Sequence, residues 1–77
     1  MKLTEAEKGV WLKIVDYCDG MGIVARLQAM GFVKNKKIKL VSAGTTGPLL
    51  IAIEHKQLML GRGLAEKITV AYCHAPN

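Results

Sequence analysis

The residues that could bind a metal ion are two cysteines, two histidines and two neighbouring aspartates: Cys18, Cys73, His55, His74, Asp16 and Asp19. Cysteine and histidine ligands form a chelate most readily when they stand a few positions apart on one turn. Apart from the adjacent Cys73 and His74, no two of the cysteines and histidines have such a spacing. We therefore expect no metal site and no other cofactor, and interpret these residues as reduced thiols and surface histidines.

Catalytic residues are equally hard to nominate. Covalent catalysis needs a nucleophile, a base and an orienting group within reach of one another, and no spacing in the chain indicates such a set. The glycine-rich segments GTTGP (44–48) and GRG (61–63) lack the ending of lysine followed by serine or threonine with which a phosphate-binding loop holds a nucleotide. We expect that the protein is not an enzyme.

Four of the eleven basic residues fall within six positions: Lys34, Lys36, Lys37 and Lys39. Such a run is most often the solvated surface of a turn. It can also contact an acidic surface of a partner protein or the anionic headgroups of a membrane. Both interpretations stay open at the level of the sequence.

Nucleic acid is the alternative partner, because small barrels bind it and the formal net charge is +5. Proteins that bind single strands combine a basic groove with stacking aromatic rings. The chain offers only four aromatic residues, Trp11, Tyr17, Phe32 and Tyr72, and the alternation of its strand turns Tyr72 inward. We therefore favour a protein partner and expect no nucleic acid, although a nucleic-acid-binding barrel remains the alternative function.

The length of 77 residues predicts a single small domain over residues 1–77, with its core from about residue 3 to residue 73. The first twenty residues mix acidic and basic side chains and contain no apolar stretch typical of a secretory signal. The longest strongly apolar run is LLIAI (49–53), whereas a membrane span needs about twenty residues. We expect a cytoplasmic protein that does not insert into a membrane.

The first part of the chain is predicted to form a short helical turn and then a strand. Thr4 and Glu7 have the spacing of a capping box, which predicts a short helical turn that ends by Gly9. Residues 10–17 then alternate between apolar and mixed positions, which predicts a strand. Its inward face carries Val10, Leu12 and Ile14.

The segment GIVARLQAMGF (22–32) changes to a helical period. Its apolar residues recur at three- and four-residue spacing and are Ile23, Val24, Leu27 and Met30. Gly31 can adopt the left-handed conformation that ends a helix, and Phe32 can then fold back on Leu27 in a Schellman ending. We therefore predict a short helix that closes at MGF.

A turn centred on Asn35 follows the helix, because asparagine tolerates positive φ better than other residues that have a side chain. The next strand turns Ile38 and Leu40 inward and Lys37 and Lys39 outward. It ends at the loop SAGTTGP (42–48).

Two further strands, 49–53 and 58–60, are predicted to form a hairpin through the four-residue connection EHKQ (54–57). In that hairpin the facing pairs are Ile53 with Leu58, Ala52 with Met59, and Ile51 with Leu60. The inward face carries Leu49, Ile51, Ile53, Leu58 and Leu60, and the outward face carries Leu50, Ala52 and Met59. A helical turn in GRGLAEK (61–67) leads to a last strand whose inward residues are Ile68, Val70 and Tyr72.

Five short strands and one short helix predict a mostly β protein, a small, partly open five-stranded barrel in which the helix covers one side. The terminal strands of such a barrel commonly pair antiparallel. Cys18, after the first strand, then lies opposite the start of the last strand, and Cys73 lies at that strand's far end. A disulfide needs Cα atoms within about 7 Å, so we expect the two thiols to be too far apart to bridge.

The order of several short motifs resembles the FeoA family of small cytoplasmic ferrous iron transport proteins. These motifs are RLQAMGF (26–32), KIKLV (37–41), the GP before the next strand, and LMLGRGLAEKITV (58–70), and the resemblance runs from Leu3 to about Val70. Asn35 stands where the family usually has glycine, and EHKQ lacks the family's usual hairpin glycine.

The resemblance implies a barrel like that of Src-homology-3 (SH3) domains and a partnership with FeoB, the membrane ferrous iron transporter that carries a cytoplasmic G-protein domain. It also implies similarity to the barrel appended to some metal-dependent repressors. The function expected from it is that of a non-enzymatic adaptor in ferrous iron uptake.

The outward apolar residues Leu50, Ala52 and Met59 need an explanation, because the outer face of a half-exposed strand is normally polar. The short helix could fold over them and make a second small core. They could instead form an exposed contact for the transporter or for a second copy of the chain, with Met59 as an adaptable contact residue. We expect partner-binding residues among these three positions and the four clustered lysines, and both explanations stay open.

Overall fold

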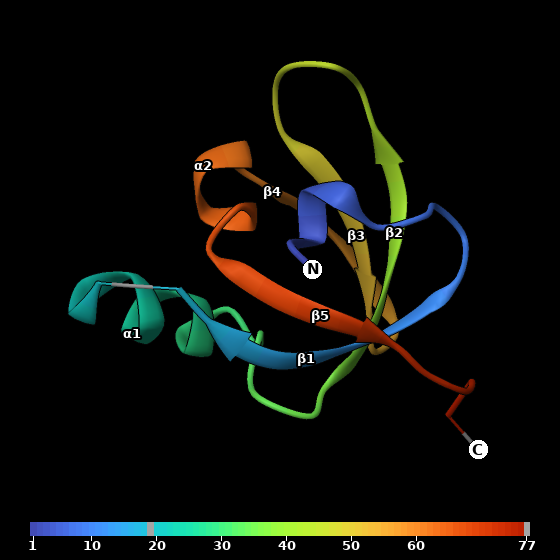
Figure 1. The fold of residues 1–77 in the computed structure, drawn as a ribbon, viewed down its shortest axis with the longest axis horizontal. Helices are drawn as coiled ribbons and strands as arrows, with labels where there is room; N and C mark the ends of the chain where they lie inside the picture. The colour runs from blue at the N-terminus through green and yellow to red at the C-terminus, as the bar shows by residue number, and fades with distance from the viewer. Residues whose placement is uncertain (19, 77) are drawn as a thin grey trace.

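Strands and short helical segments follow one another along the chain in the computed structural model, which describes residues 1–18 and 20–76. The 3₁₀ helix η1 spans Leu3–Glu5, and the α-helices are α1 (Met21–Ala29) and α2 (Arg62–Ala65). The strands are β1 (Trp11–Tyr17), β2 (Lys37–Ala43), β3 (Leu49–Ile53), β4 (Lys56–Leu60) and β5 (Ile68–Tyr72). They form one antiparallel sheet in the order β4-β3-β2-β1-β5, which coils into a partly open barrel (Figure 1). The predicted mostly β, SH3-like fold with five strands is confirmed.

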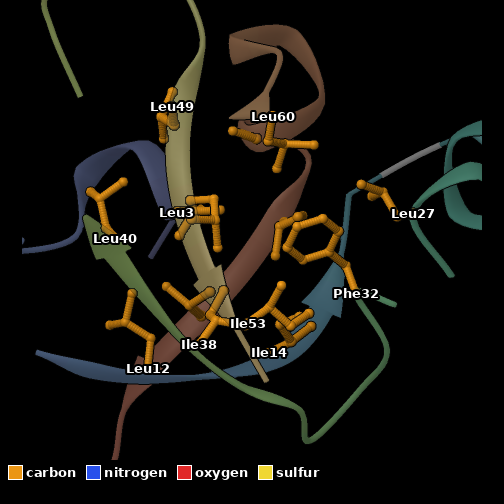
Figure 2. Close-up of a cluster of buried hydrophobic side chains, with 14 residues drawn as sticks. Leu3, Leu12, Ile14, Leu27, Phe32, Ile38, Leu40, Leu49, Ile53 and Leu60 are labelled. Atoms are coloured by element: carbon orange, nitrogen blue, oxygen red, sulfur yellow. The ribbon is translucent and has the colours of Figure 1, made fainter. Parts of the chain in front are cut away.

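The core lies inside the coiled sheet and follows the predicted alternation. Side chains from every strand converge there, together with Leu3 and Phe32 (Figure 2). Leu12, Ile14 and Ile38 are fully buried, as their alternation indicates. Because the described buried residues are all apolar, burial of hydrocarbon rather than of polar groups stabilises the interior.

The open side of the barrel lies between the two ends of the sheet, β4 and β5, and is closed by small elements. η1 lies beside both α2 and β5, and its Leu3 is fully buried, as is Ala65 of α2. Backbone atoms of Met1 bond Val70 along the outer edge of β5. The sequence prediction of a single helix covering one side is therefore wrong in part, because two shorter segments close the seam.

α1 packs at one end of the barrel, beside β1 (Figure 1). Leu27 of this helix is fully buried, and Gly31 ends the helix with φ at 96°. The Phe32 N–H donates to the carbonyl of Leu27 (2.9 Å), and the Gly31 N–H donates to that of Gln28 (3.0 Å). These two bonds constitute the predicted Schellman ending.

The N-terminal cap differs from the prediction. The N–H of Lys2, rather than of Thr4, bonds the carboxylate of Glu5 (2.8 Å), and the helical segment ends at Glu5. The prediction of a capping box formed by Thr4 and Glu7 is therefore wrong. The reason is that the buried Leu3 is the first residue of the helical turn, which makes Lys2 the N-cap residue. The turn ends at Glu5, so a cap at Thr4 would leave it too few residues.

The hairpin between β3 and β4 has a two-residue turn, Glu54 and His55, in place of the predicted four-residue connection. Ile53 pairs with Lys56, Ile51 with Leu58, and Leu49 with Leu60. β4 therefore begins at Lys56, and the predicted pairs are wrong by two residues. The faces are nevertheless as predicted, because a shift of two residues preserves the side to which each side chain points.

The terminal strands pair antiparallel, as expected, with Leu12 opposite Tyr72 and Tyr17 opposite Ile68. The prediction that Tyr72 points into the core is wrong, because the residue is 55% exposed. Tyr72 has the inward parity, but it is the last residue of β5 and lies where the interior opens to solvent.

The two glycine-rich segments meet through Arg62 of α2. Its guanidinium donates to the carbonyl oxygens of Gly44 (2.6 Å) and Gly47 (3.0 Å). Segments 44–48 and 61–63 are thus joined by two hydrogen bonds, which hold the β2–β3 loop against the turn that follows β4.

Candidate functional site

The outer face of β3 and β4 carries an apolar patch made of Leu50, Ala52 and Met59. Leu50 lies directly opposite Met59, a residue that is 58% exposed, and Leu50 and Ala52 are half-buried. The explanation in which α1 covers these residues is wrong, because α1 lies at the end of the barrel near β1 (Figure 1). The patch is therefore accessible to a partner.

Val41 extends the apolar patch on β2, and sequence reasoning did not single it out. The register between β2 and β3 shifts between Leu40 and Ser42, so Val41 and Ser42 together oppose Leu50. Val41 is 37% exposed. A bulge of this kind has no clear sequence signature, because two residues on one strand then face one residue on the other.

Two of the four clustered lysines are neutralised within the protein. The Lys34 Nζ atom lies 3.6 Å from a carboxylate oxygen of Asp16, and the Lys36 Nζ atom lies 3.8 Å from one of Glu54. Ion pairs exposed to this degree contribute little to stability. Their main effect here is to reduce the positive charge of the turn.

The other two lysines lie on the outer face of β2. The Lys39 ammonium lies over the ring of Trp11, 4.6 Å from its centroid, a cation–π contact. Lys37 lies directly opposite Lys13 of β1. The sequence indicated Trp11 only as one of four aromatic residues and gave no reason to choose Lys13, because only strand pairing brings β1 beside the lysine run.

A shallow groove of about 640 Å³ borders this surface. It is lined by Trp11, by the turn 33–37, by the hairpin residues Glu54 and His55, and by Pro76 of the C-terminal segment. The groove therefore brings together three basic residues of the turn and the apolar surfaces of Trp11, Val33 and Pro76.

The candidate metal ligands are dispersed. Asp16 is paired with Lys34, His55 lies in the β3–β4 turn, and Cys18 and Cys73 lie at opposite ends of the β1–β5 pair. Asp19 lies outside the described residues. Within residues 1–18 and 20–76, no three histidine, cysteine, aspartate or glutamate side chains could together hold a metal ion.

Burial raises the pKa of the Tyr17 phenol above its ordinary value of 10.0, and the neighbouring Asp16 carboxylate raises this pKa further. The hydroxyl donates a hydrogen bond to the carbonyl oxygen of Phe32. Tyr17 is thus a neutral hydrogen-bond donor that packs against the core, which is a structural role.

None of the described helices is both long and apolar enough to span a membrane.

A family model described as the FeoA domain matches residues 1–72. A comparison with curated proteins gives no match. Among solved structures, the chain is similar to an iron uptake regulatory protein (FeoA), with a TM-score of 0.83 and 24% identity over 91% of this chain and 93% of that one.

Two further structures show the same fold. The iron(II) transport protein A of Clostridium thermocellum has a TM-score of 0.83 and 26% identity, covering 94% of this chain and 45% of that chain. A manganese-dependent transcriptional repressor has a TM-score of 0.84 with 16% identity, covering 95% of this chain and 41% of that chain. At that identity the repressor shows likeness of fold alone.

Proposed function

The chain belongs to the FeoA domain family, whose members are non-enzymatic accessory proteins associated with ferrous iron transport, and on that basis we propose that it binds the cytoplasmic part of a FeoB-like membrane transporter. In this role it acts in the cytoplasm as an adaptor that supports or regulates iron uptake. The observation that carries the proposal is the family match over residues 1–72.

The apolar patch supports a docking role. Met59 is 58% exposed and, with Leu50, places an apolar pair on the outer face of an antiparallel sheet. Exposed apolar patches on small soluble domains commonly mark contact surfaces. Methionine adapts its shape to a partner, which suits Met59 to such a contact.

Binding of purified protein to the transporter's cytoplasmic domain, measured by biolayer interferometry, tests the proposal. The wild type should bind, and Leu50→Ser combined with Met59→Gln should abolish binding while leaving the melting temperature close to that of the wild type. Val15→Gln, at another exposed apolar residue of the sheet, is the matched control and should bind normally.

Three results would count against parts of the proposal. A wild-type protein that does not bind the domain contradicts the proposed function. Normal binding by the Leu50 and Met59 variant removes the apolar patch from the interface but leaves the function in place. Loss of a self-associated form in that variant, without a change in transporter binding, assigns the patch to contacts between copies of the chain.

Nucleic acid is the alternative partner, and the same instrument tests it. Exposed Tyr72 and half-buried Trp11 do not form a common platform, because Tyr72 shares the face of Leu12 whereas Trp11 points to the other face. Strong, salt-sensitive retention of single-stranded RNA, together with no binding to the transporter domain, would favour the alternative function.

A further inference from the structure

Lys13 and Lys37 place two positive charges directly opposite each other across β1 and β2. Like charges in this position repel each other and oppose pairing of the strands. Neither lysine forms an ion pair with any described residue, whereas the nearby Lys34 and Lys36 are paired with Asp16 and Glu54. The sheet therefore holds a concentrated, uncompensated positive charge at this point.

The groove beside this pair combines charge with apolar surface. Lys37 and Trp11 both line it, and Val33 and Pro76 add hydrocarbon to its walls. The Lys39 ammonium lies over the Trp11 ring, and Trp11 also lines the groove. A ligand that fits this surface has negative charge beside an apolar group.

Most lysines around the groove are recessed, whereas Lys34, which also lines it, is exposed but paired with Asp16. Lys13, Lys37 and Lys39 are half-buried, and the Lys36 side chain is only 31% exposed. Recessed charges favour a chain that enters the groove over a flat membrane surface. Single-stranded nucleic acid would need several stacking rings, and Trp11 is the aromatic residue that lines the groove.

Since the proposed function already supplies a protein partner, we propose that an extended acidic segment of that partner binds in this groove. Its carboxylates contact the Lys13 and Lys37 ammonium groups, and an apolar side chain beside them packs against Trp11. This contact adjoins the apolar patch on β3 and β4, because Ala52 of the patch lies directly opposite Lys39. The groove confers charge selectivity, and the patch buries hydrocarbon.

Trp11 is the sole tryptophan of the chain, so its fluorescence reports on the groove directly. The probe is a short synthetic peptide of alternating glutamate and serine with one central leucine, and the matched peptide has glutamine in place of glutamate. The glutamate peptide should change the Trp11 emission saturably, with an affinity that falls as salt rises. The glutamine peptide should bind far more weakly.

Substitution of lysines then tests which positive charges bind the glutamate peptide. A charge contact that solvent still reaches changes affinity by a factor of about three, so Lys13→Gln combined with Lys37→Gln should weaken peptide binding about tenfold. Lys8→Gln combined with Arg26→Gln changes the net charge equally at exposed positions outside the groove and should leave binding nearly unchanged.

Equal weakening of peptide binding in both double variants would overturn the inference, and so would equal binding of the two peptides. Tighter binding of phosphatidylserine vesicles or of single-stranded RNA than of the glutamate peptide would overturn it as well. The peptide titration uses no transporter, so its failure leaves the proposed function intact. Peptide binding without transporter binding supports the groove and contradicts the proposed function instead.

Discussion

The Tyr17 hydroxyl donates a hydrogen bond of 2.5 Å to the backbone carbonyl oxygen of Phe32. Tyr17 is the last residue of β1, and Phe32 is the residue whose N–H completes the Schellman ending of α1. The bond therefore ties the two ends of the segment 17–32 together. It holds α1 at the end of the barrel, where Leu27 reaches the core.

Tyr17→Phe should lower the free energy of unfolding by about 1 kcal/mol, because the partly buried Phe32 carbonyl loses its donor. Urea denaturation followed by circular dichroism measures the change. Tyr72→Phe is the control, since Tyr72 is 55% exposed and its hydroxyl accepts an exposed hydrogen bond from the Glu7 N–H (3.3 Å), which water can replace. It should change the stability by less than about 0.5 kcal/mol. Equal losses in the two variants would contradict the role given to Tyr17.

The stability of the protein should depend on pH, because the pKa of the Tyr17 phenol is raised in the fold. Burial is the larger cause, and the Asp16 carboxylate adds to it. Between its ordinary value of 10.0 and its higher value in the fold, the unfolded chain loses the phenol proton while the native protein keeps it. The stabilisation is thus complete below about pH 10 and is lost as pH rises through the folded pKa. Urea midpoints from pH 8 to pH 11 should fall more steeply for wild type than for Tyr17→Phe, and parallel curves would contradict this.

Gly31→Ala should destabilise the protein by about 1–2 kcal/mol through backbone strain. The φ of Gly31 is 96°, whereas a Cβ atom there would lie 3.7 Å from Ile53 Cδ1, an ordinary contact distance. Gly63→Ala in α2 is the matched control, because its Cβ would meet no atom within 4 Å and its φ is not positive. That variant should be neutral or more stable by up to about 1 kcal/mol, since alanine favours helix. Thermal melts of both variants test the contrast.

The repulsion between Lys13 and Lys37 should lower the stability of the protein. Lys13→Gln and Lys37→Gln should each raise the free energy of unfolding by about 0.2–1 kcal/mol, because each removes the same cross-strand repulsion. The double variant should gain less than the sum, and the gain should shrink in high salt. Lys8→Gln is the exposed control. Additive gains that do not depend on salt would show that the two charges do not interact.

The two thiols should not form an intramolecular disulfide. The Cys18 N–H bonds the carbonyl of Lys67, and the Cys73 N–H bonds that of Trp11, so the cysteines lie at opposite ends of the β1–β5 pair. At about 3.3 Å per residue, these ends are roughly 20 Å apart. Alkylation without reductant, followed by mass spectrometry, should find both thiols free in the native monomer. A Cys18–Cys73 peptide in the digest would contradict this topology.

Local patterns in the sequence were enough to predict most of the strand residues of the core and the end of the helix. Alternation placed Leu12 and Ile38 on the inward face, because burial on one side of a strand needs only a period of two. Gly31 and Phe32 indicated the Schellman ending, because its hydrogen bonds join residues at most five positions apart.

The tertiary structure alone decided the hairpin register and the surroundings of the lysines. Glu54 adopts a φ of 57° in a two-residue turn where glycine is favoured, so the sequence carried no signal for that turn. Lys37 meets Lys13 only because β1 and β2 pair across more than twenty residues of chain. Periodicity tells which side of a strand a residue occupies. Its neighbour on the next strand depends on register, which the packing of the whole barrel determines.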